Sequence, residues 1–232
     1  MSLKPSPLPD APLKAAAIEA MFDRIAPRYD LVNHVMTLGL DRSWRRRTVR
    51  ELRLRRGERV VDLACGTGDL CDELQRAGLR PIGVDFAAAM LVRAHTTVPL
   101  VRADILQLPF ADASLDGVTC GFALRNVTSI DACFQEAARV LRDGGRAAFL
   151  EVATPSSPLI RAGHSLYFEH VVPLLGALLS DRRAYRYLPA STAYLPVPVT
   201  LMGMLANAGF TGVRRLALGA GAAQLMTATR SR

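Results

Sequence analysis

The chain has 232 residues, of which 50% are hydrophobic, and this predicts one domain with a substantial core. Its longest dense apolar run, residues 171–179, is far shorter than the roughly 20 residues of a membrane-spanning helix. The first 14 residues also lack the apolar stretch of a signal peptide, so we expect a cytoplasmic protein rather than a secreted or membrane-spanning one.

The formal net charge is +8, and lysine occurs only twice among the 29 basic residues. Arginines concentrate in residues 42–59, a run that is first interpreted as a solvated helix face. Contact with an anionic membrane is the second interpretation, and nucleic acid is not expected because aromatic residues do not interleave with the charges. The four cysteines and four histidines lack the spacing of a metal site, so no bound metal is predicted.

The N-terminal part is predicted to be a proline-rich disordered tail over residues 1–13, followed by a helical cover over 14–56. Within and just before this cover, apolar residues recur at helical spacing in two segments, 13–26 and 31–52. Residues 14–232 are expected to form a single domain.

From residue 59 onward, apolar strands alternate with helices. The predicted strands occupy residues 59–64, 80–85, 98–104, 114–123 and 146–153, and the helices between them 68–78, 87–95 and 130–145. Such alternation predicts a three-layer α/β fold, in which a mainly parallel sheet carries helices on both faces. The rest of the chain is predicted to form a helical lid over 156–200, including a helix at 158–179, then a helix at 199–210 and strands at 211–218 and 222–230.

The turn after the first strand, "DLACGTGD" at residues 62–69, is the first candidate site, because doubly wound sheets bind ligands beyond the carboxyl ends of their strands. Gly66 and Gly68 let a ligand approach the main chain. A dinucleotide would need a third glycine, which is missing, and Asp69 would repel its pyrophosphate. Asp62 and Asp69 instead suit S-adenosylmethionine, which carries a sulfonium and an ammonium group.

Two further acids favour the same cofactor. Asp85 ends the second strand, where a carboxylate accepts hydrogen bonds from both ribose hydroxyls. Asp104 ends the third strand and is predicted to accept from the adenine amino group, while the backbone N–H of Ile105 meets a ring nitrogen. The pattern therefore predicts a pocket for S-adenosylmethionine at the tips of successive strands.

Several separated motifs resemble the ubiquinone/menaquinone biosynthesis C-methyltransferase family, a branch of the class I methyltransferases. They are "MFDRIAPRYDLVNHVMTLGLDRSWRR" (21–46), "DLACGTGD" (62–69), "LPFADASLDGVTCGFALRNV" (108–127), "RVLRDGGRAAFLE" (139–151) and "YRYLPAS" (185–191). The resemblance implies a Rossmann-like fold with a mostly parallel seven-stranded sheet and one antiparallel C-terminal strand.

The resemblance also implies which residues bind the cofactor: Thr67, Asp85, Asp104 and Ile105, with Gly66 and Gly68 shaping the loop. Gly121 stands where the family often has a serine that contacts the cofactor. The implied reaction is methyl transfer to a ring carbon of a polyprenylated quinol, with demethylmenaquinol favoured over a ubiquinone precursor. A methyltransferase for another small molecule such as a polyketide or sterol, an NAD-dependent oxidoreductase and a nucleic-acid-binding module remain alternatives.

The predicted catalytic residues follow from what this transfer requires. The quinol becomes nucleophilic at carbon as its hydroxyl loses a proton, so the site must favour the oxyanion and accept that proton. We expect Arg125 to stabilise the naphtholate and Asn126 to orient the ring or a water molecule. Asp69 and Tyr29 are expected to complete the network, with a bound water as the proton acceptor.

The polyprenyl tail requires an apolar channel. The residues expected to line it are Met21, Phe22, Ile25, Phe168, Val171 and Leu175. An exposed apolar mouth beside the arginine run would suit a peripheral membrane enzyme. The oligomeric state stays open, with a homodimer among the alternatives.

Overall fold

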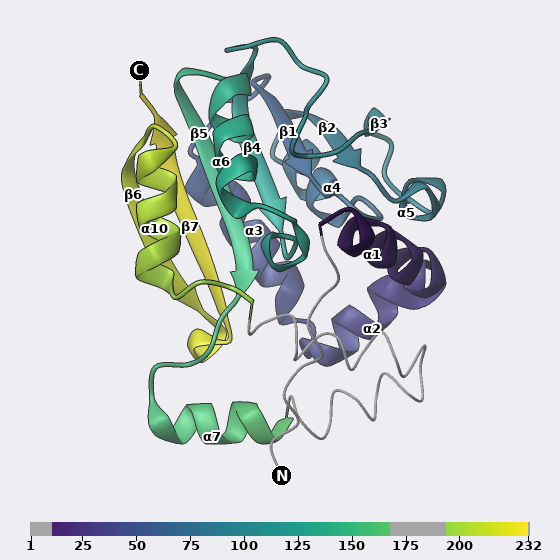
Figure 1. Ribbon diagram of the computed structural model, residues 1–232, viewed down its shortest axis with the longest axis vertical. Coiled ribbons are helices and arrows are strands. Elements are labelled where there is room, and N and C mark those ends of the chain that lie inside the picture. The colour runs from purple at the N-terminus through teal and green to yellow at the C-terminus, as the bar shows by residue number, and fades with distance from the viewer. Residues whose placement is uncertain (1–10, 168–193, 232) are drawn as a thin grey trace.

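The structure is a computed structural model that describes residues 11–167 and 194–231. Within these residues, seven strands form one sheet in the order β3-β2-β1-β4-β5-β7-β6 (Figure 1). The strands are β1 (Arg59–Leu63), β2 (Arg80–Asp85), β3 (Leu100–Arg102), β4 (Leu115–Gly121), β5 (Leu141–Val152), β6 (Phe210–Leu218) and β7 (Ala223–Arg230). Only β7 runs antiparallel to its neighbours, β5 and β6, which confirms the predicted mostly parallel sheet with an antiparallel C-terminal strand.

Helices cover both faces of the sheet, as the alternation of elements predicts. The α-helices are α1 (Ala11–Ile25), α2 (Tyr29–Met36), α3 (Leu40–Leu52), α4 (Asp69–Arg76), α5 (Ala88–Val92), α6 (Ile130–Val140), α7 (Pro158–Leu166) and α10 (Pro198–Asn207). Helices α6 and α10 lie on the near face of the sheet in Figure 1, and α3 and α4 lie behind it. No helix in the described part of the chain is long and apolar enough to cross a membrane.

The core lies in two layers, one on each side of the sheet. On the α6 side, Phe134 and Phe149 are fully buried and meet edge to face with ring centroids 4.8 Å apart. On the α3 side, Trp44 and Leu74 pack against the other face. The central strands are therefore buried on both sides, which explains why β1 has four consecutive buried residues after an exposed first one.

Two predicted helices end earlier than the periodicity indicates. The helix expected over 31–52 is broken into α2 and α3, because Leu38 and Gly39 adopt positive φ angles of 52° and 76°. Thr37 stabilises this turn through its hydroxyl, which donates to the carbonyl of Asn33 and to Asp41. The helix expected over 130–145 stops at Val140, because Leu141 is already extended and begins β5.

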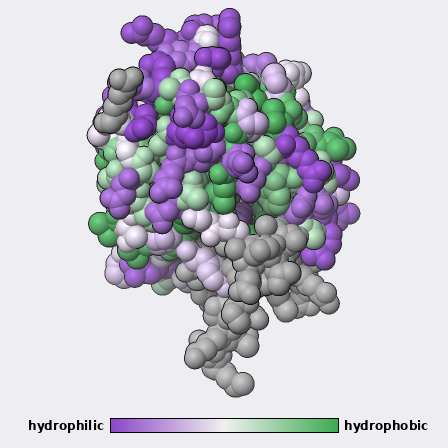
Figure 2. Space-filling model, turned by 45° about the horizontal axis from the view of Figure 1, so that its top comes forward, coloured by the Kyte–Doolittle hydropathy of each residue, from purple (hydrophilic) through white to green (hydrophobic). Residues whose placement is uncertain are grey.

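The remaining boundaries differ by a few residues. Helix α1 begins at Ala11, inside the segment predicted to be a tail, and the helix predicted over 158–179 is described only as α7. Most of the predicted lid, including Phe168, Val171 and Leu175, lies outside the described residues. Figure 2 shows the molecule with the top of Figure 1 brought forward. On the face in view, hydrophilic side chains gather at the upper end and hydrophobic ones form separate patches below.

The order of the strands in the sheet indicates where a ligand is expected to bind. Strand β1 has β2 on one side and β4 on the other, so the order reverses between β1 and β4. Ligands of such sheets bind beyond the carboxyl ends of the strands at this switch point. Helices α1 and α2 lie at the same end of the sheet in Figure 1, next to α5.

Candidate active site

A cleft opens at the carboxyl ends of β1, β2 and β4. It has a volume of about 170 Å³ and is partly open to solvent. The described residues that line it are Ile18, Phe22, Ala64, Gly66, Asp85, Phe86, Met90, Asp104, Ile105, Leu106, Gly121, Phe122, Ala123, Asn126, Val127 and Thr128. Two of these residues are acidic and none is basic, so the cleft suits a cation better than a pyrophosphate.

Asp85 fixes the glycine turn from the end of β2. Its Oδ2 accepts a hydrogen bond of 2.8 Å from the backbone N–H of Gly66, and its Oδ1 accepts one of 2.9 Å from Ala87. Burial raises the pKa of Asp85 in spite of these hydrogen bonds. Each carboxylate oxygen can accept more than one hydrogen bond, so the group can hold the turn and still receive ribose hydroxyls, as predicted.

Asp104 and Ile105 lie beside Asp85, just after the end of β3. Asp104 is exposed, and its Oδ1 accepts a hydrogen bond of 2.9 Å from the N–H of Leu106, in the turn that follows β3. Ile105 is buried and contributes an apolar side chain to the same wall. The structure therefore brings five of the predicted cofactor residues to one cleft: Gly66, Asp85, Asp104, Ile105 and Gly121.

Asp62 does not line the cleft, which corrects the expectation that its carboxylate faces the cofactor. The side chain is buried near the end of β1, where Oδ1 accepts a 2.7 Å hydrogen bond from Thr119 and Oδ2 accepts a 3.6 Å one from the Cys71 thiol. Burial raises the pKa of Asp62 to about 7. The acid is therefore part of the packing beneath the glycine turn.

The raised pKa makes the stability depend on pH in a defined direction. The folded state keeps the Asp62 proton up to about pH 7, whereas the unfolded chain releases it near its ordinary pKa of 3.8. The contribution is fully present below about pH 4 and is lost as the pH rises towards 7, roughly 4 kcal/mol in total. Denaturant unfolding should show that Asp62→Asn removes this slope, and parallel curves for variant and wild type would refute the assignment.

Thr67 and Gly68 shape the turn without lining the cleft. Thr67 is buried, and its hydroxyl donates a 2.6 Å hydrogen bond to Asp30, which ties the turn to α2. Gly68 precedes α4 with a φ of 98°, in the left-handed region that favours glycine. A Cβ at Gly68 would lie 2.5 Å from Cγ2 of Thr96, so the turn has no room for a larger residue.

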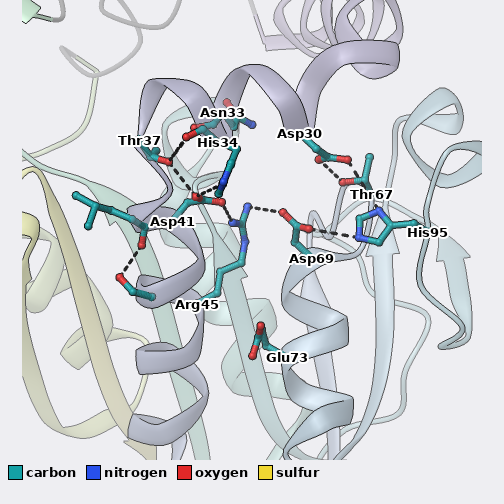
Figure 3. Close-up of polar contacts among 12 residues, drawn as sticks. Asp30, Asn33, His34, Thr37, Asp41, Arg45, Thr67, Asp69, Glu73 and His95 are labelled. Atoms are coloured by element: carbon teal, nitrogen blue, oxygen red, sulfur yellow. Dashed lines mark hydrogen bonds and ion pairs between the residues drawn. The ribbon is translucent and has the colours of Figure 1, made fainter.

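Asp69 belongs to a polar network that joins the helical cover to the glycine turn (Figure 3). Its Oδ2 lies 3.0 Å from Nη2 of Arg45 on α3, and its Oδ1 lies 3.3 Å from Nε2 of His95. Arg45 also pairs with Asp41, and His95 lies 3.9 Å from Asp30. Asp69 is therefore engaged with α3 and does not line the cleft, in contrast to its predicted contact with the cofactor or the acceptor.

The pKa values of two aspartates in this network are shifted in opposite directions. Burial raises the pKa of Asp30 and outweighs the hydrogen bond from Thr67. Burial acts in the same direction on Asp41, but Arg45 and the hydroxyl of Thr37 outweigh it, so the pKa of Asp41 is lowered. Arg45 therefore holds a charged carboxylate in a buried position in the first turn of α3.

Removing Arg45 should destabilise the cover. We expect Arg45→Met to lower the free energy of unfolding by about 2–3 kcal/mol, because Asp41 then stays buried without its cationic partner. Arg46→Met is the matched control, since the next side chain is exposed, and should change stability by less than about 0.5 kcal/mol. Urea unfolding of both variants measures the two changes in free energy. Equal changes would show that the ion pair of Arg45 with Asp41 does not stabilise the fold.

The predicted catalytic residues are separated by the structure. Asn126 lines the cleft, whereas Arg125, its neighbour in a 3₁₀ turn (Leu124–Asn126), is buried and paired with Glu151 of β5. This corrects the expectation that the guanidinium faces the acceptor. Tyr29 begins α2, and its side chain lies outside the described atoms.

Of the α1 residues that were expected to line the channel for the polyprenyl tail, only some line the cleft. Phe22 lines the cleft together with Ile18 of the same helix. Met21 and Ile25 do not line it, but they pack in the same apolar cluster as Phe22, together with Val32 of α2. Helix α1 therefore joins α2 to the wall of the cleft.

Sequence reasoning missed Asp30, Arg45, His95 and Glu151 as parts of the site. Their partners are distant in the sequence: Asp30 bonds to Thr67, 37 positions away, and Glu151 bonds to Arg125, 26 positions away. Only one signal was available in the sequence, a glutamate near the end of an apolar strand, which is uncommon in a buried position unless it is paired.

Comparisons with known proteins were consistent with this geometry. The ubiE/COQ5 methyltransferase family profile matches residues 11–230. A relative named demethylmenaquinone methyltransferase, from Roseiflexus sp. (strain RS-1), is 45% identical over 230 residues that cover 95% of this chain and 96% of that protein.

Solved structures show the same fold. An S-adenosylmethionine-dependent methyltransferase from Thermotoga maritima, described as a possible histamine N-methyltransferase, matches with a TM-score of 0.66 at 18% identity, covering 92% of this chain and 100% of that one. Phosphoethanolamine N-methyltransferase 2 of Haemonchus contortus, in complex with S-adenosyl-L-methionine, has a TM-score of 0.58 at 13% identity, covering 80% of this chain and 52% of that one.

The sequence, the cleft and the comparisons agree on one class of enzyme. The acid-lined cleft at the switch point fits a cationic methyl donor, and the family profile decides against the dinucleotide alternative. The chain therefore belongs to the ubiE/COQ5 methyltransferase family and is an S-adenosylmethionine-dependent methyltransferase.

Proposed function

We propose that the chain methylates a ring carbon of demethylmenaquinol and so forms menaquinol. The observation that carries the proposal is the composition of the cleft, in which Asp85 and Asp104 at the strand tips face apolar walls that include Phe22 and Leu106. Such a cleft suits a cationic donor next to a hydrophobic aromatic acceptor. The relative from Roseiflexus, named for this reaction, supports the same substrate.

The bound donor supplies an electrophilic methyl group, which leaves sulfur as the ring carbon forms its new bond. The chain's own residues then have three tasks: to align the acceptor, to exclude water and to favour the oxyanion of the quinol. The apolar side chains of Ile18, Phe22 and Met90 serve the first two tasks. We expect the amide of Asn126 to hydrogen bond a ring oxygen. The hydroxyl proton passes to water before the attack. The methylated ring carbon then loses its hydrogen as a proton, and protonation of the ring oxygen gives the aromatic quinol.

The reaction can be tested with an isotopically labelled methyl group. The protein is incubated with labelled S-adenosylmethionine and reduced demethylmenaquinone, and the product is analysed by mass spectrometry and NMR. We expect label on the ring carbon with the reduced substrate and none with the oxidised quinone, which lacks the nucleophilic hydroxyl. Transfer to oxygen, or to a sterol or polyketide in preference, would reject this substrate.

We further propose that this cytoplasmic enzyme docks on anionic membranes, where its polyprenylated substrate resides. Large apolar side chains are exposed at Leu38, in the turn between α2 and α3, and at Leu159 and Leu166 of α7. The two segments are adjacent, since the Tyr167 hydroxyl donates a 3.0 Å hydrogen bond to the carbonyl of Met36. The arginines of α3 add positive charge nearby, which anionic headgroups attract.

Sedimentation with liposomes tests the docking. We expect vesicles with anionic lipid to retain more protein than neutral vesicles, and the double variant Leu38→Ser/Leu159→Ser to lose most of that binding. Val92→Ser is the control, because Val92 is equally exposed but belongs to α5. Equal retention by both kinds of vesicle would count against a membrane role.

A further inference from the structure

A buried ion pair lies directly behind the wall of the cleft. Nη1 of Arg125 contacts Oε1 of Glu151, and the two side chains are only 7% and 0% exposed. Arg125 follows β4 in the chain, whereas Glu151 is near the end of β5, so the pair joins the tips of two adjacent strands. The alignment of donor and acceptor described above does not require Glu151.

Three donors converge on this one carboxylate. Besides the guanidinium, the backbone N–H of Arg125 donates to Oε2 over 3.3 Å, and the N–H of Val152 donates to Oε1 over 2.8 Å. Glu151 therefore holds both the side chain and the main chain of Arg125. It fixes the place of the Leu124–Asn126 turn relative to β5.

That turn belongs to the wall of the cleft. Phe122, Ala123, Asn126, Val127 and Thr128 all line the cleft, and Phe122 has a φ of 61°, which is unfavourable for a bulky residue. Such a conformation persists only where the surroundings hold it. The carbonyl of Leu150 accepts a 2.7 Å hydrogen bond from the N–H of Phe122, and Glu151 holds the next turn, so β5 determines this wall.

Stability alone does not account for the pair. Burying two charges costs several kcal/mol per ion, and well-packed apolar residues of similar volume are often as stable or more so. In addition, Nε of Arg125 is buried and lacks a hydrogen-bond partner among the described residues, an arrangement that costs about 1–3 kcal/mol. A pair that adds little stability and leaves one N–H unused points to a role in binding or catalysis.

We propose that Glu151 is a positioning residue for methyl transfer, acting through Arg125 to place the Leu124–Asn126 turn, and with it Asn126, against the acceptor. This inference rests on the proposed function. It assigns to Glu151 an effect on turnover with little effect on donor affinity, since the acids that face the donor, Asp85 and Asp104, belong to other strand ends.

A double-mutant cycle tests whether Glu151 acts through Arg125. Glu151→Gln keeps the shape, but one acceptor oxygen replaces two and an NH₂ group meets the converging donors. We expect Glu151→Gln to lower kcat at least about tenfold and to change the Kd for S-adenosylmethionine less than about threefold. In the background of Arg125→Met, the same substitution should change kcat less than about twofold. Glu73→Gln, which alters a surface ion pair with Arg76, is the control and should leave kcat unchanged.

A second measurement does not depend on the acceptor. Hydrogen exchange of the backbone amides should accelerate at residues 122–128 in Glu151→Gln, with α6 and the rest of β5 unchanged. Unchanged exchange at 122–128, an equal loss of kcat in both backgrounds, or a kcat within about twofold of wild type would overturn the inference. Absence of methyl transfer by the wild-type protein would instead reject the proposed substrate, while the exchange experiment would still decide the role of Glu151.

Discussion

Asp85→Asn should lower the affinity for S-adenosylmethionine by about 100-fold. The carboxylate of Asp85 holds the glycine turn through the N–H groups of Gly66 and Ala87 while it faces the cleft. Hydrogen bonds to a charged group contribute roughly 1.5–3 kcal/mol each, and a 100-fold loss corresponds to about 2.7 kcal/mol. The amide of Asn has one acceptor oxygen in place of two, so its NH₂ group must face an N–H of the turn or a ribose hydroxyl that the carboxylate accepts.

Calorimetric titration with S-adenosylmethionine and with its demethylated product measures this loss. Burial already raises the pKa of Asp85, so a neutral side chain of the same shape should be tolerated and the protein should stay folded. Asp143→Asn makes the same change in charge at an exposed position outside the cleft and should bind the donor normally. An affinity of Asp85→Asn within about threefold of wild type would contradict the assignment.

Gly68→Ala should damage both the fold and donor binding. Its φ of 98° is unfavourable by roughly 1–2 kcal/mol for a residue with a Cβ, and that Cβ would lie 2.5 Å from Cγ2 and 2.7 Å from Cβ of Thr96. We expect a loss of about 3 kcal/mol in unfolding free energy and a drop in melting temperature of roughly 6–12 °C. Donor affinity should fall at least about tenfold, because the turn shifts at the floor of the cleft.

The structure provides a control and a rescue for this prediction. Gly57 also has a positive φ, 86°, but a Cβ added there would meet no atom within 4 Å, so Gly57→Ala measures backbone strain alone. Thr96→Gly removes the clashing atoms and should recover part of the stability of Gly68→Ala. If Gly57→Ala and Gly68→Ala destabilise equally, steric exclusion by Thr96 plays no part.

The sheet and the cofactor cleft were predictable because their signals are local. Apolar runs that end close to Asp85 and Asp104 fix where β2 and β3 stop, and the parallel sheet then brings both acids to one edge. The break between α2 and α3 was missed because the apolar periodicity continues through Thr37–Gly39, while the turn depends on positive φ angles and on the Thr37 hydroxyl. The spacing of apolar residues gives no information on the backbone angles and side-chain hydrogen bonds that form such a turn.

The roles of the acids around the glycine turn were harder to predict. Asp62 and Asp69 flank the turn in the sequence, yet one is buried against Thr119 and the other faces Arg45. Arg125 was placed correctly at the end of β4, but its burial depends on Glu151, 26 positions later. In each case the direction of a side chain is decided by a partner from another strand or helix, which the spacing of residues along the chain does not reveal.

A crystal structure with S-adenosylhomocysteine would show whether the donor binds in the cleft at the tips of β1, β2 and β4, on which the assigned reaction depends. We predict that the ribose hydroxyls lie within hydrogen-bond distance of Asp85 and that the adenine lies beside Asp104 and Ile105. The ligand bound elsewhere, for example in the polar groove between α3 and α4 near Arg42 and Glu73, would contradict this placement.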